Sequence, residues 1–150
     1  MEYVTLNNGI KMPKLGYGVY QTPPEDTKRC VLDAIDVGYR SIDTAQAYGI
    51  ESWGPFAEGR KEMFTDPVLT AIGAKYGKTA AQTALRFLMQ SDVVIIPKSV
   101  HKERMQQNFD LFDFTLSAGD MAAIEALDGG ESLFFSHYDP KTVEWFMSLL

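Results

Sequence analysis

The sequence predicts an α/β protein, because short apolar runs that suit buried strands alternate with segments of helical periodicity. Val93 to Ile96 is a β-branched run too short for a helix, and Pro97 cannot donate to a sheet ladder, so a strand is expected to end there. Residues 39–44 form a second candidate strand, directly after a helix predicted over 23–37. This order of elements is typical of a parallel sheet.

Composition indicates an ordinary soluble protein. The chain has 150 residues, 45% hydrophobic and 23% charged, which is enough for one compact domain with a sizeable core. Its net charge of −6 argues against a nucleic-acid or anionic-membrane partner. Cys30 is the only cysteine, so an intrachain disulfide and a cysteine zinc cluster are both excluded. Because no apolar run approaches the ~20 residues of a membrane span and no leader peptide is evident, we expect a reducing cytoplasm as the setting.

The amino-terminal part predicts a β-hairpin and then a strand. Residues 3–6 and 10–12 flank Asn8-Gly9, a dipeptide that suits the positive φ angles of a tight primed turn. A strand is expected from Lys14 to Val19. Its glycines, Gly16 and Gly18, are poor strand formers and suggest close approach by a neighbour or a ligand.

The helix over 23–37 has recognisable ends. Thr22 is the expected N-cap, Pro23 the first helical residue, and Glu25 the partner that completes a capping box. Gly38 is the expected C-cap. The buried face is predicted to contain Val31, Ala34 and Ile35, and Cys30 is interpreted as a small core residue.

The second strand carries ionisable groups at its carboxyl end. Asp43 lies there, and Tyr48 follows five residues later on the loop. In βα barrels this end of the strands is where catalysis takes place. Taken alone, the same pair could equally be a turn former and an exposed aromatic.

The remainder of the chain predicts more strands and helices. A third strand is expected over 50–53, and helices over 66–76, 79–90, 102–109 and 117–127, the last capped by Ser117 and stopped by Gly129-Gly130. The apolar face of the helix over 79–90 is predicted to be Ala81, Ala84, Leu85 and Leu88. An aromatic-rich tail follows, with Phe134, Phe135, Tyr138, Trp145 and Phe146.

Polar residues directly follow the strand that ends at Pro97. Lys98 and Ser99 lie just past its carboxyl end, and Arg104 belongs to the first turn of the next helix. An ammonium, a hydroxyl and a guanidinium beside a helix amino end suit a phosphate monoester. The alternative is a solvated basic turn.

Four stretches together resemble a known family. Residues 15–20 (LGYGVY), 38–49 (GYRSIDTAQAYG), 52–55 (SWGP) and 95–108 (IIPKSVHKERMQQN) are similar, in family order, to the aldo-keto reductases, which are NADP(H)-dependent enzymes built on the (β/α)8 TIM barrel. Such a barrel takes about 250 residues. The resemblance therefore implies a single domain over 1–150 that is internally truncated: a half barrel with an amino-terminal hairpin and without the central strands.

The resemblance also implies a cofactor site and part of a catalytic site. Residues 95–108 correspond to the site for the 2′-phosphate and adenine of NADP(H), whereas Val19, Tyr20 and Trp53 correspond to positions beside the nicotinamide. The implied cofactor-binding residues are Val19, Tyr20, Asp43, Trp53, Pro55, Phe56, Ile96, Pro97, Lys98, Ser99, Arg104, Gln107 and Asn108. Asp43 and Tyr48 are the implied catalytic residues.

Two further catalytic groups of the family have no match. A free phenol has a pKa of about 10. In the family, a lysine lowers the pKa of the catalytic tyrosine, and a histidine orients the carbonyl substrate. Both lie on strands that this sequence lacks, and His101 and His137 are outside the matching motifs. We therefore expect an impaired reductase of small aldehydes or ketones. The alternatives are a non-catalytic NADP(H)-binding remnant and an unligated oligomeric scaffold.

The truncation poses a geometric problem at Gly49 and Ile50. These residues bridge only about 7 Å, whereas a five-residue strand spans about 17 Å and a parallel return normally needs a dozen residues. In a barrel the retained strands would lie in the order 50–53, 93–96, 14–19, 39–44. Residues 50–53 could therefore run antiparallel or form a loop, two chains could exchange segments as a homodimer, or the open edges could prevent stable folding. We favour the exchanged dimer.

Overall fold

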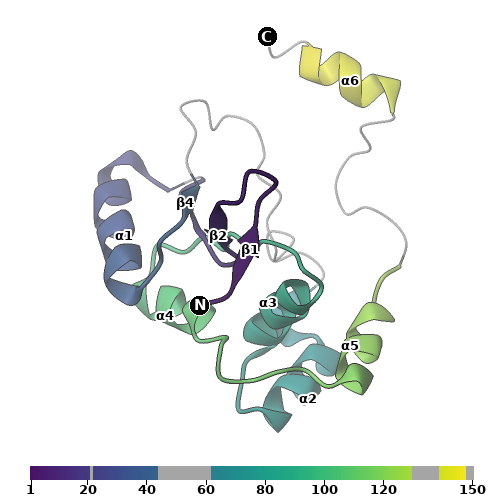
Figure 1. Ribbon diagram of the computed structural model, residues 1–150. Helices are drawn as coiled ribbons and strands as arrows, with labels where there is room; N and C mark the ends of the chain where they lie inside the picture. Colours follow the sequence, from purple (N-terminus) through teal and green to yellow (C-terminus); the bar gives the residue numbers. More distant parts are fainter. Residues whose placement is uncertain (21, 44–61, 130–138, 148–150) are drawn as a thin grey trace.

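A computed structural model describes residues 1–20, 22–43, 62–129 and 139–147 (Figure 1). The predictions made for Tyr48, for the strand at 50–53 and for Trp53, Pro55 and Phe56 lie outside these ranges. The elements in chain order are β1 (Tyr3–Thr5), β2 (Lys11–Pro13), β3 (Tyr17–Gly18), α1 (Pro24–Val37), β4 (Ile42–Asp43), α2 (Pro67–Lys75), α3 (Ala80–Gln90), α4 (Lys102–Phe109), α5 (Ala118–Glu125) and α6 (Pro140–Met147).

The amino-terminal hairpin is confirmed, but its turn differs from the prediction. β1 and β2 pair antiparallel, with Val4 opposite Met12. Gly9 has φ 82° and its N–H donates to the Leu6 carbonyl at 2.9 Å, while the Asn8 side chain accepts from the Ile10 N–H at 3.1 Å. Asn8 keeps a negative φ, so the loop is a three-residue one closed by a left-handed glycine. The prediction of a primed turn was wrong.

Short parallel segments form the centre of the molecule. β3 and β4 pair in parallel, with Tyr17 opposite Ile42 and Gly18 opposite Asp43. On the other side of β3, Leu15 forms a parallel bridge with Ile95. The order of these three neighbours agrees with the order expected for the segments 93–96, 14–19 and 39–44.

Two of the paired segments are shorter than predicted, and a neighbouring helix end binds the first residue of each. The Val93 N–H donates to Leu88 in α3 at 3.0 Å, which keeps Val93 out of the ladder and 43% exposed. The predicted strand over 93–96 therefore reduces to a bridge at Ile95. In the same way, the Tyr39 N–H donates to the Ala34 carbonyl in α1 at 3.0 Å, which keeps Tyr39 out of the ladder; β4 spans Ile42–Asp43.

Helix α1 begins one residue later than predicted and without a capping box. Pro23 is at the N-cap position with no side-chain cap, and Gly38 is the C-cap with φ 124°, as expected. Cys30 and Ala34 are buried, whereas Ile35 is 46% exposed, contrary to the prediction. Positions 30 and 34 are one helical turn apart and face the strands, and position 35 is rotated by about 100° from position 34.

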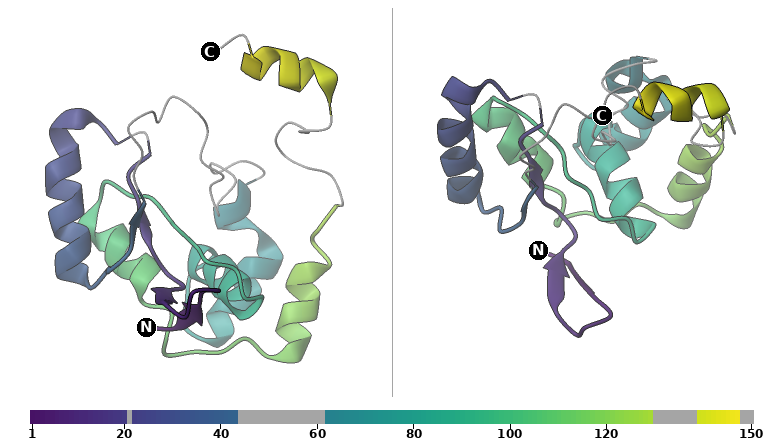
Figure 2. Two further views of the ribbon diagram at one scale, coloured as in Figure 1. Left: turned by 45° about the horizontal axis from the view of Figure 1, so that its top comes forward. Right: turned by 90° about the horizontal axis from the view of Figure 1, so that it is seen from above.

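Helices α2, α3, α4 and α5 agree with the predictions to within a few residues, whereas α6 lies in the tail, where no helix was predicted. Asp66 caps α2, Thr79 and Gln82 form a capping box on α3, and Ser117 and Asp120 form one on α5. Helices α1, α4, α3, α2 and α5 pack in a continuous row around the strands (Figures 1 and 2). In Figure 1, α6 stands apart from this row. Within the described ranges no helix has the length and apolarity needed to cross a membrane.

Asp120 connects α5 to the end of α2. Its carboxylate accepts from Lys75 Nζ at 2.5 Å, from Tyr76 Oη at 2.6 Å and from Ser117 Oγ at 2.6 Å. The residue is 4% exposed, and the hydrogen bond from Lys75, followed by those from Ser117 and Tyr76, holds the pKa of Asp120 well below its usual range. A carboxyl with a lowered folded-state pKa stabilises the fold above its unfolded pKa of about 3.9, and this contribution is lost as the pH falls through the folded value.

The variant Asp120→Asn is accordingly expected to be less stable than the parent above about pH 4, and the difference should shrink as the pH is lowered further. Urea midpoints between about pH 2 and pH 7 measure this. Glu125→Gln, at an exposed position of the same helix, is the control and should follow the parent. A difference that stays constant over the whole pH range would contradict the assignment.

Candidate functional site

A pocket of about 560 Å³ lies at the amino end of α4. It brings together five residues predicted from the sequence: Lys98, Ser99, Arg104, Gln107 and Asn108. The volume falls within the range of small-molecule sites, roughly 300–1,000 Å³. The segment 98–108 therefore forms one wall of a cavity of ligand size.

The turn 98–101, which we call the phosphate turn, is fixed from behind. The Tyr17 hydroxyl, on β3, donates to the Ser99 carbonyl at 2.6 Å. Burial raises the pKa of Tyr17, so this phenol stays protonated and able to donate at neutral pH. In front, Ser99 Oγ accepts from the His101 N–H at 3.1 Å, and Ser99 as a whole is only 8% exposed.

Cations and helix N–H groups meet at this turn. His101 is the N-cap of α4 and makes no side-chain cap, and the first turn of a helix carries backbone N–H groups without partners inside the helix. Lys98 and Arg104 line the same pocket, whereas the Lys102 side chain extends to Asp36 on α1. Two cations beside a helix amino end are suited to a dianionic phosphate.

The part of the pocket lining that comes from other segments was not predicted from the sequence. It consists of Phe64, Thr79 and Ala81, and Val100 and His101 also line the pocket. Gln82 Nε2 donates to the carbonyls of Gln107 and Asp110 at 3.0 and 3.1 Å, which draws the start of α3 against the end of α4. The sequence indicates a capping residue at position 79. It does not indicate that the helix which follows, α3, packs against α4.

A second group of predicted residues lies at the carboxyl ends of the parallel segments. The Val19 N–H donates to the Asp43 carbonyl at 3.3 Å, and half-buried Tyr20 follows. A Cβ on Gly18 would lie 3.3 Å from the Ile96 carbonyl oxygen, so the close approach predicted at this glycine is present. Ile96 and Pro97 lead from this group into the phosphate turn. The backbone at Ile96 and Pro97 therefore connects the residues at the carboxyl ends of the parallel segments to the pocket residues 98–108.

Tyr48, the predicted proton donor, lies outside the described residues, as do Trp53, Pro55 and Phe56. Among the described residues, no group of three or more His, Cys, Asp or Glu side chains could hold a metal ion.

Solved structures with a similar fold include aldo-keto reductases. The apo form of Gox0644 superimposes with a TM-score of 0.82 at 20% identity, over 90% of this chain and 96% of that chain. A variant of Gox0644 in complex with NADPH gives a TM-score of 0.77 at 17% identity, over 90% of this chain and 96% of that one. At these identities the comparison shows the fold.

Sequence comparison shows the family. The model described as the Aldo/keto reductase family matches residues 56–129. Morphine 6-dehydrogenase of Pseudomonas putida is 45% identical over 112 residues, 66% of this chain and 37% of that protein. An aldo-keto reductase of Mycobacterium sp. (strain KMS) is 25% identical over 271 positions, 93% of this chain and 96% of that protein. The chain belongs to the aldo-keto reductase family.

The Mycobacterium alignment also shows how the chain relates to a full-length relative. The 93% of this chain that is aligned amounts to about 140 residues (0.93 × 150), spread over 271 positions. Close to half of the relative therefore has no counterpart here, although both ends of it are matched. The chain spans little more than a third of the Pseudomonas enzyme.

Proposed function

We propose that this chain binds NADP(H), with the adenosine 2′-phosphate half of the cofactor in the pocket at the amino end of α4. The observation that carries the proposal is the convergence of Lys98, Ser99 and Arg104 on one cavity of about 560 Å³. Membership of an NADP(H)-dependent family supports it, as does the NADPH complex of the structural neighbour Gox0644.

The residues present fit the chemistry of this group. Lys98, Arg104 and the N–H groups of α4 would bind the 2′-phosphate, which carries close to two negative charges at neutral pH. Gln107 and buried Asn108 would supply amide groups beside the adenine. The nicotinamide half would extend toward Val19, Tyr20 and Asp43, at the carboxyl ends of the strands, where ligands bind in α/β folds.

The reaction we propose is the reduction of a small aldehyde or ketone. NADPH supplies the hydride when bound, and Tyr48 would donate the proton to the carbonyl oxygen, with Asp43 beside it. The family lysine that lowers the tyrosine pKa has no counterpart in the matching stretches. Because general acid catalysis typically contributes 10²–10⁴-fold, we propose that turnover is reduced by a factor in that range.

The reductase and the non-catalytic remnant are separated by following NADPH oxidation with a panel of aldehydes. A reductase is expected to oxidise NADPH slowly in proportion to protein, and Tyr48→Phe should abolish this. If the parent binds NADPH but does not oxidise it, the chain is a non-catalytic NADP(H)-binding remnant. Oxidation that survives Tyr48→Phe would show that another group, or a contaminating enzyme, is responsible.

We further propose that the fold is a half barrel completed by a second chain. The parallel order Ile95, β3, β4 supports the half barrel, and the unmatched middle of the relatives supports completion by a partner. Light scattering is expected to give 33.6 kDa, twice the 16.8 kDa of one chain. A monodisperse monomer that retains NADPH binding would refute the exchange.

A further inference from the structure

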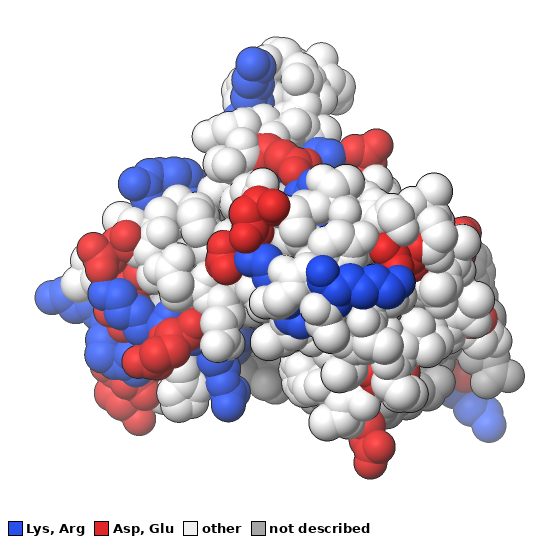
Figure 3. Space-filling view, turned by 90° about the horizontal axis from the view of Figure 1, so that it is seen from below, with Lys and Arg blue, Asp and Glu red and all other residues white. Residues whose placement is uncertain are grey.

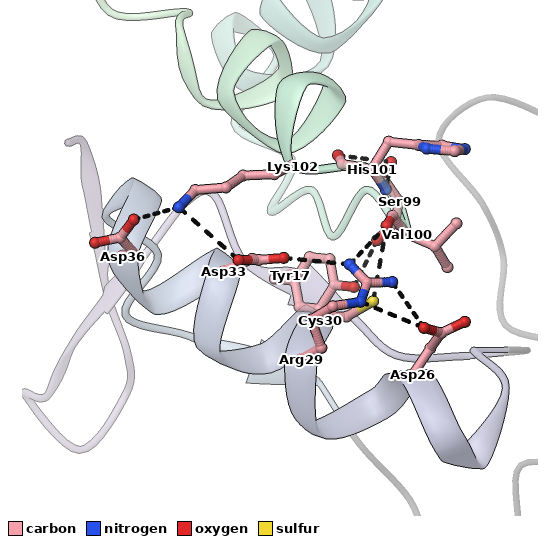
Figure 4. A network of polar contacts seen from close by, with 10 residues as sticks. All are labelled: Tyr17, Asp26, Arg29, Cys30, Asp33, Asp36, Ser99, Val100, His101 and Lys102. Atoms are coloured by element: carbon pink, nitrogen blue, oxygen red, sulfur yellow. Dashed lines mark hydrogen bonds and ion pairs between the residues drawn. The ribbon is translucent and has the colours of Figure 1, made fainter.

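Helix α1 contacts the phosphate turn through the backbone of Val100 (Figure 4). Arg29 Nη1 donates to the Val100 carbonyl at 3.2 Å, and Cys30 Sγ approaches the same oxygen at 3.9 Å. Asp26 and Asp33 accept from the Arg29 guanidinium at 2.8 and 3.2 Å, one from each side. The guanidinium is therefore fixed in one orientation, in which Nη1 donates both to Asp33 and to the Val100 carbonyl.

Fixing the Val100 carbonyl also fixes the Ser99 hydroxyl. The peptide unit between Val100 and His101 is planar and trans, so the direction of its carbonyl sets the direction of the His101 N–H. That N–H donates to Ser99 Oγ at 3.1 Å. A contact on α1, outside the pocket, thus orients a hydroxyl that lines it.

We propose that Arg29 is a positioning residue for recognition of the 2′-phosphate: it holds the phosphate turn in its binding conformation through the Val100 carbonyl. The inference rests on the proposed function, because it concerns the same pocket. Arg29 does not line the pocket and would act without touching the ligand. Removing it should impair recognition of the 2′-phosphate and spare recognition of the rest of the nucleotide.

Long-range attraction by the Arg29 charge is a weaker explanation. Arg29 with Asp26 and Asp33 carries a formal charge of −1 (+1 −1 −1), so the group as a whole does not attract an anion. Over α1, at the left of Figure 3, basic and acidic side chains alternate. The Arg29 side chain is 51% exposed, and exposed pairs of this kind contribute little stability, which makes a specific effect on the turn measurable without unfolding.

The test measures the dissociation constants of 2′,5′-ADP and of 5′-AMP, which lacks the 2′-phosphate, by calorimetry. Arg29→Ala is expected to raise the dissociation constant of 2′,5′-ADP by about three- to tenfold. The dissociation constant of 5′-AMP should stay within about twofold of the parent value. Arg29→Lys, which keeps a donor, should restore most of the affinity. Arg29→Met keeps the packing of the side-chain stem and should behave as Arg29→Ala does.

Two controls separate position from charge and from general stability. Arg29→Ala combined with Asp26→Asn keeps the formal charge of the group at −1 and should still bind 2′,5′-ADP weakly. Arg40→Ala removes an arginine that also donates to main-chain carbonyls, those of Ile35 and Tyr39, but away from the turn. It should bind both nucleotides as the parent does.

The outcomes distinguish the inference from the function on which it rests. If the parent does not bind 2′,5′-ADP, the proposed function fails. If the parent binds and the Arg29 variants bind equally well, the positioning role is refuted. Recovery in the charge-balanced double variant would assign the effect to charge, and equal losses for both nucleotides would assign it to stability; either result overturns the inference.

Discussion

Replacing Arg104 with alanine is expected to weaken NADPH binding by roughly tenfold to a hundredfold, and to change NADH binding by less than about twofold. A hydrogen bond to a charged group contributes about 1.5–3 kcal/mol, and every 1.4 kcal/mol is tenfold in affinity. Only NADPH carries the 2′-phosphate, to which the proposed site assigns this guanidinium. Fluorescence titration of the parent and the variant with both dinucleotides measures the difference.

Lys102→Ala is the matched control for Arg104. Lys102 is also a cation in the first turn of α4, but its ammonium binds Asp36 at 2.5 Å and lies 3.8 Å from Asp33, on the side of α1. Any loss of affinity in this variant should affect the two dinucleotides equally. Equal losses of NADPH and NADH in Arg104→Ala itself would refute the phosphate assignment.

The second large effect is expected at Gly73, on the stability of the fold. Gly73 is buried in α2, where a Cβ would lie 2.5 Å from the Lys78 carbonyl oxygen and 2.7 Å from Thr83 Oγ1. The carbonyl belongs to the backbone and cannot rotate away, so α2 and α3 would have to separate. We expect Gly73→Ala to cost about 1–3 kcal/mol in the free energy of unfolding, measured by urea titration.

Gly119→Ala is the control that should change stability in the opposite direction. Gly119 is an exposed residue of α5, and an added Cβ would meet nothing closer than Ser117 Oγ at 3.9 Å. Glycine is less favourable than alanine in a helix interior by up to about 1 kcal/mol, so this variant, in the first turn of α5, should be stabilised by no more than that amount. If both variants were destabilised alike, the cost at Gly73 could not be attributed to crowding.

The sequence predicted α1 to α5 and the residues that form one wall of the pocket, because both depend on neighbours in the chain. Capping residues such as Ser117 act within one helical turn. Lys98, Ser99 and Arg104 lie close together in the sequence, in the turn 98–101 and the first turn of α4. The lengths of the paired segments depend instead on competition: Val93 and Tyr39 each donate to a helix end rather than to a strand. Local sequence patterns carry no information about which partner prevails.

The remaining errors have the same physical origin. Thr79 and Ala81 reach the pocket because Gln82 joins α3 to α4 across 25 residues, which no periodicity indicates. The exposure of Ile35 depends on which face of α1 meets the strands, and an apolar residue at helical spacing does not determine this. Gly18, by contrast, was recognisable in advance, since a glycine in a strand commonly marks close backbone approach.

The central claim is that residues 98–108 form a site for NADP(H). Equilibrium titration of NADPH into size-fractionated protein, followed by fluorescence and with NADH as the comparison, tests it most directly. We predict saturable binding of NADPH that is at least roughly tenfold tighter than that of NADH. Absence of binding by a well-folded fraction, or equal affinity for the two dinucleotides, would contradict the account.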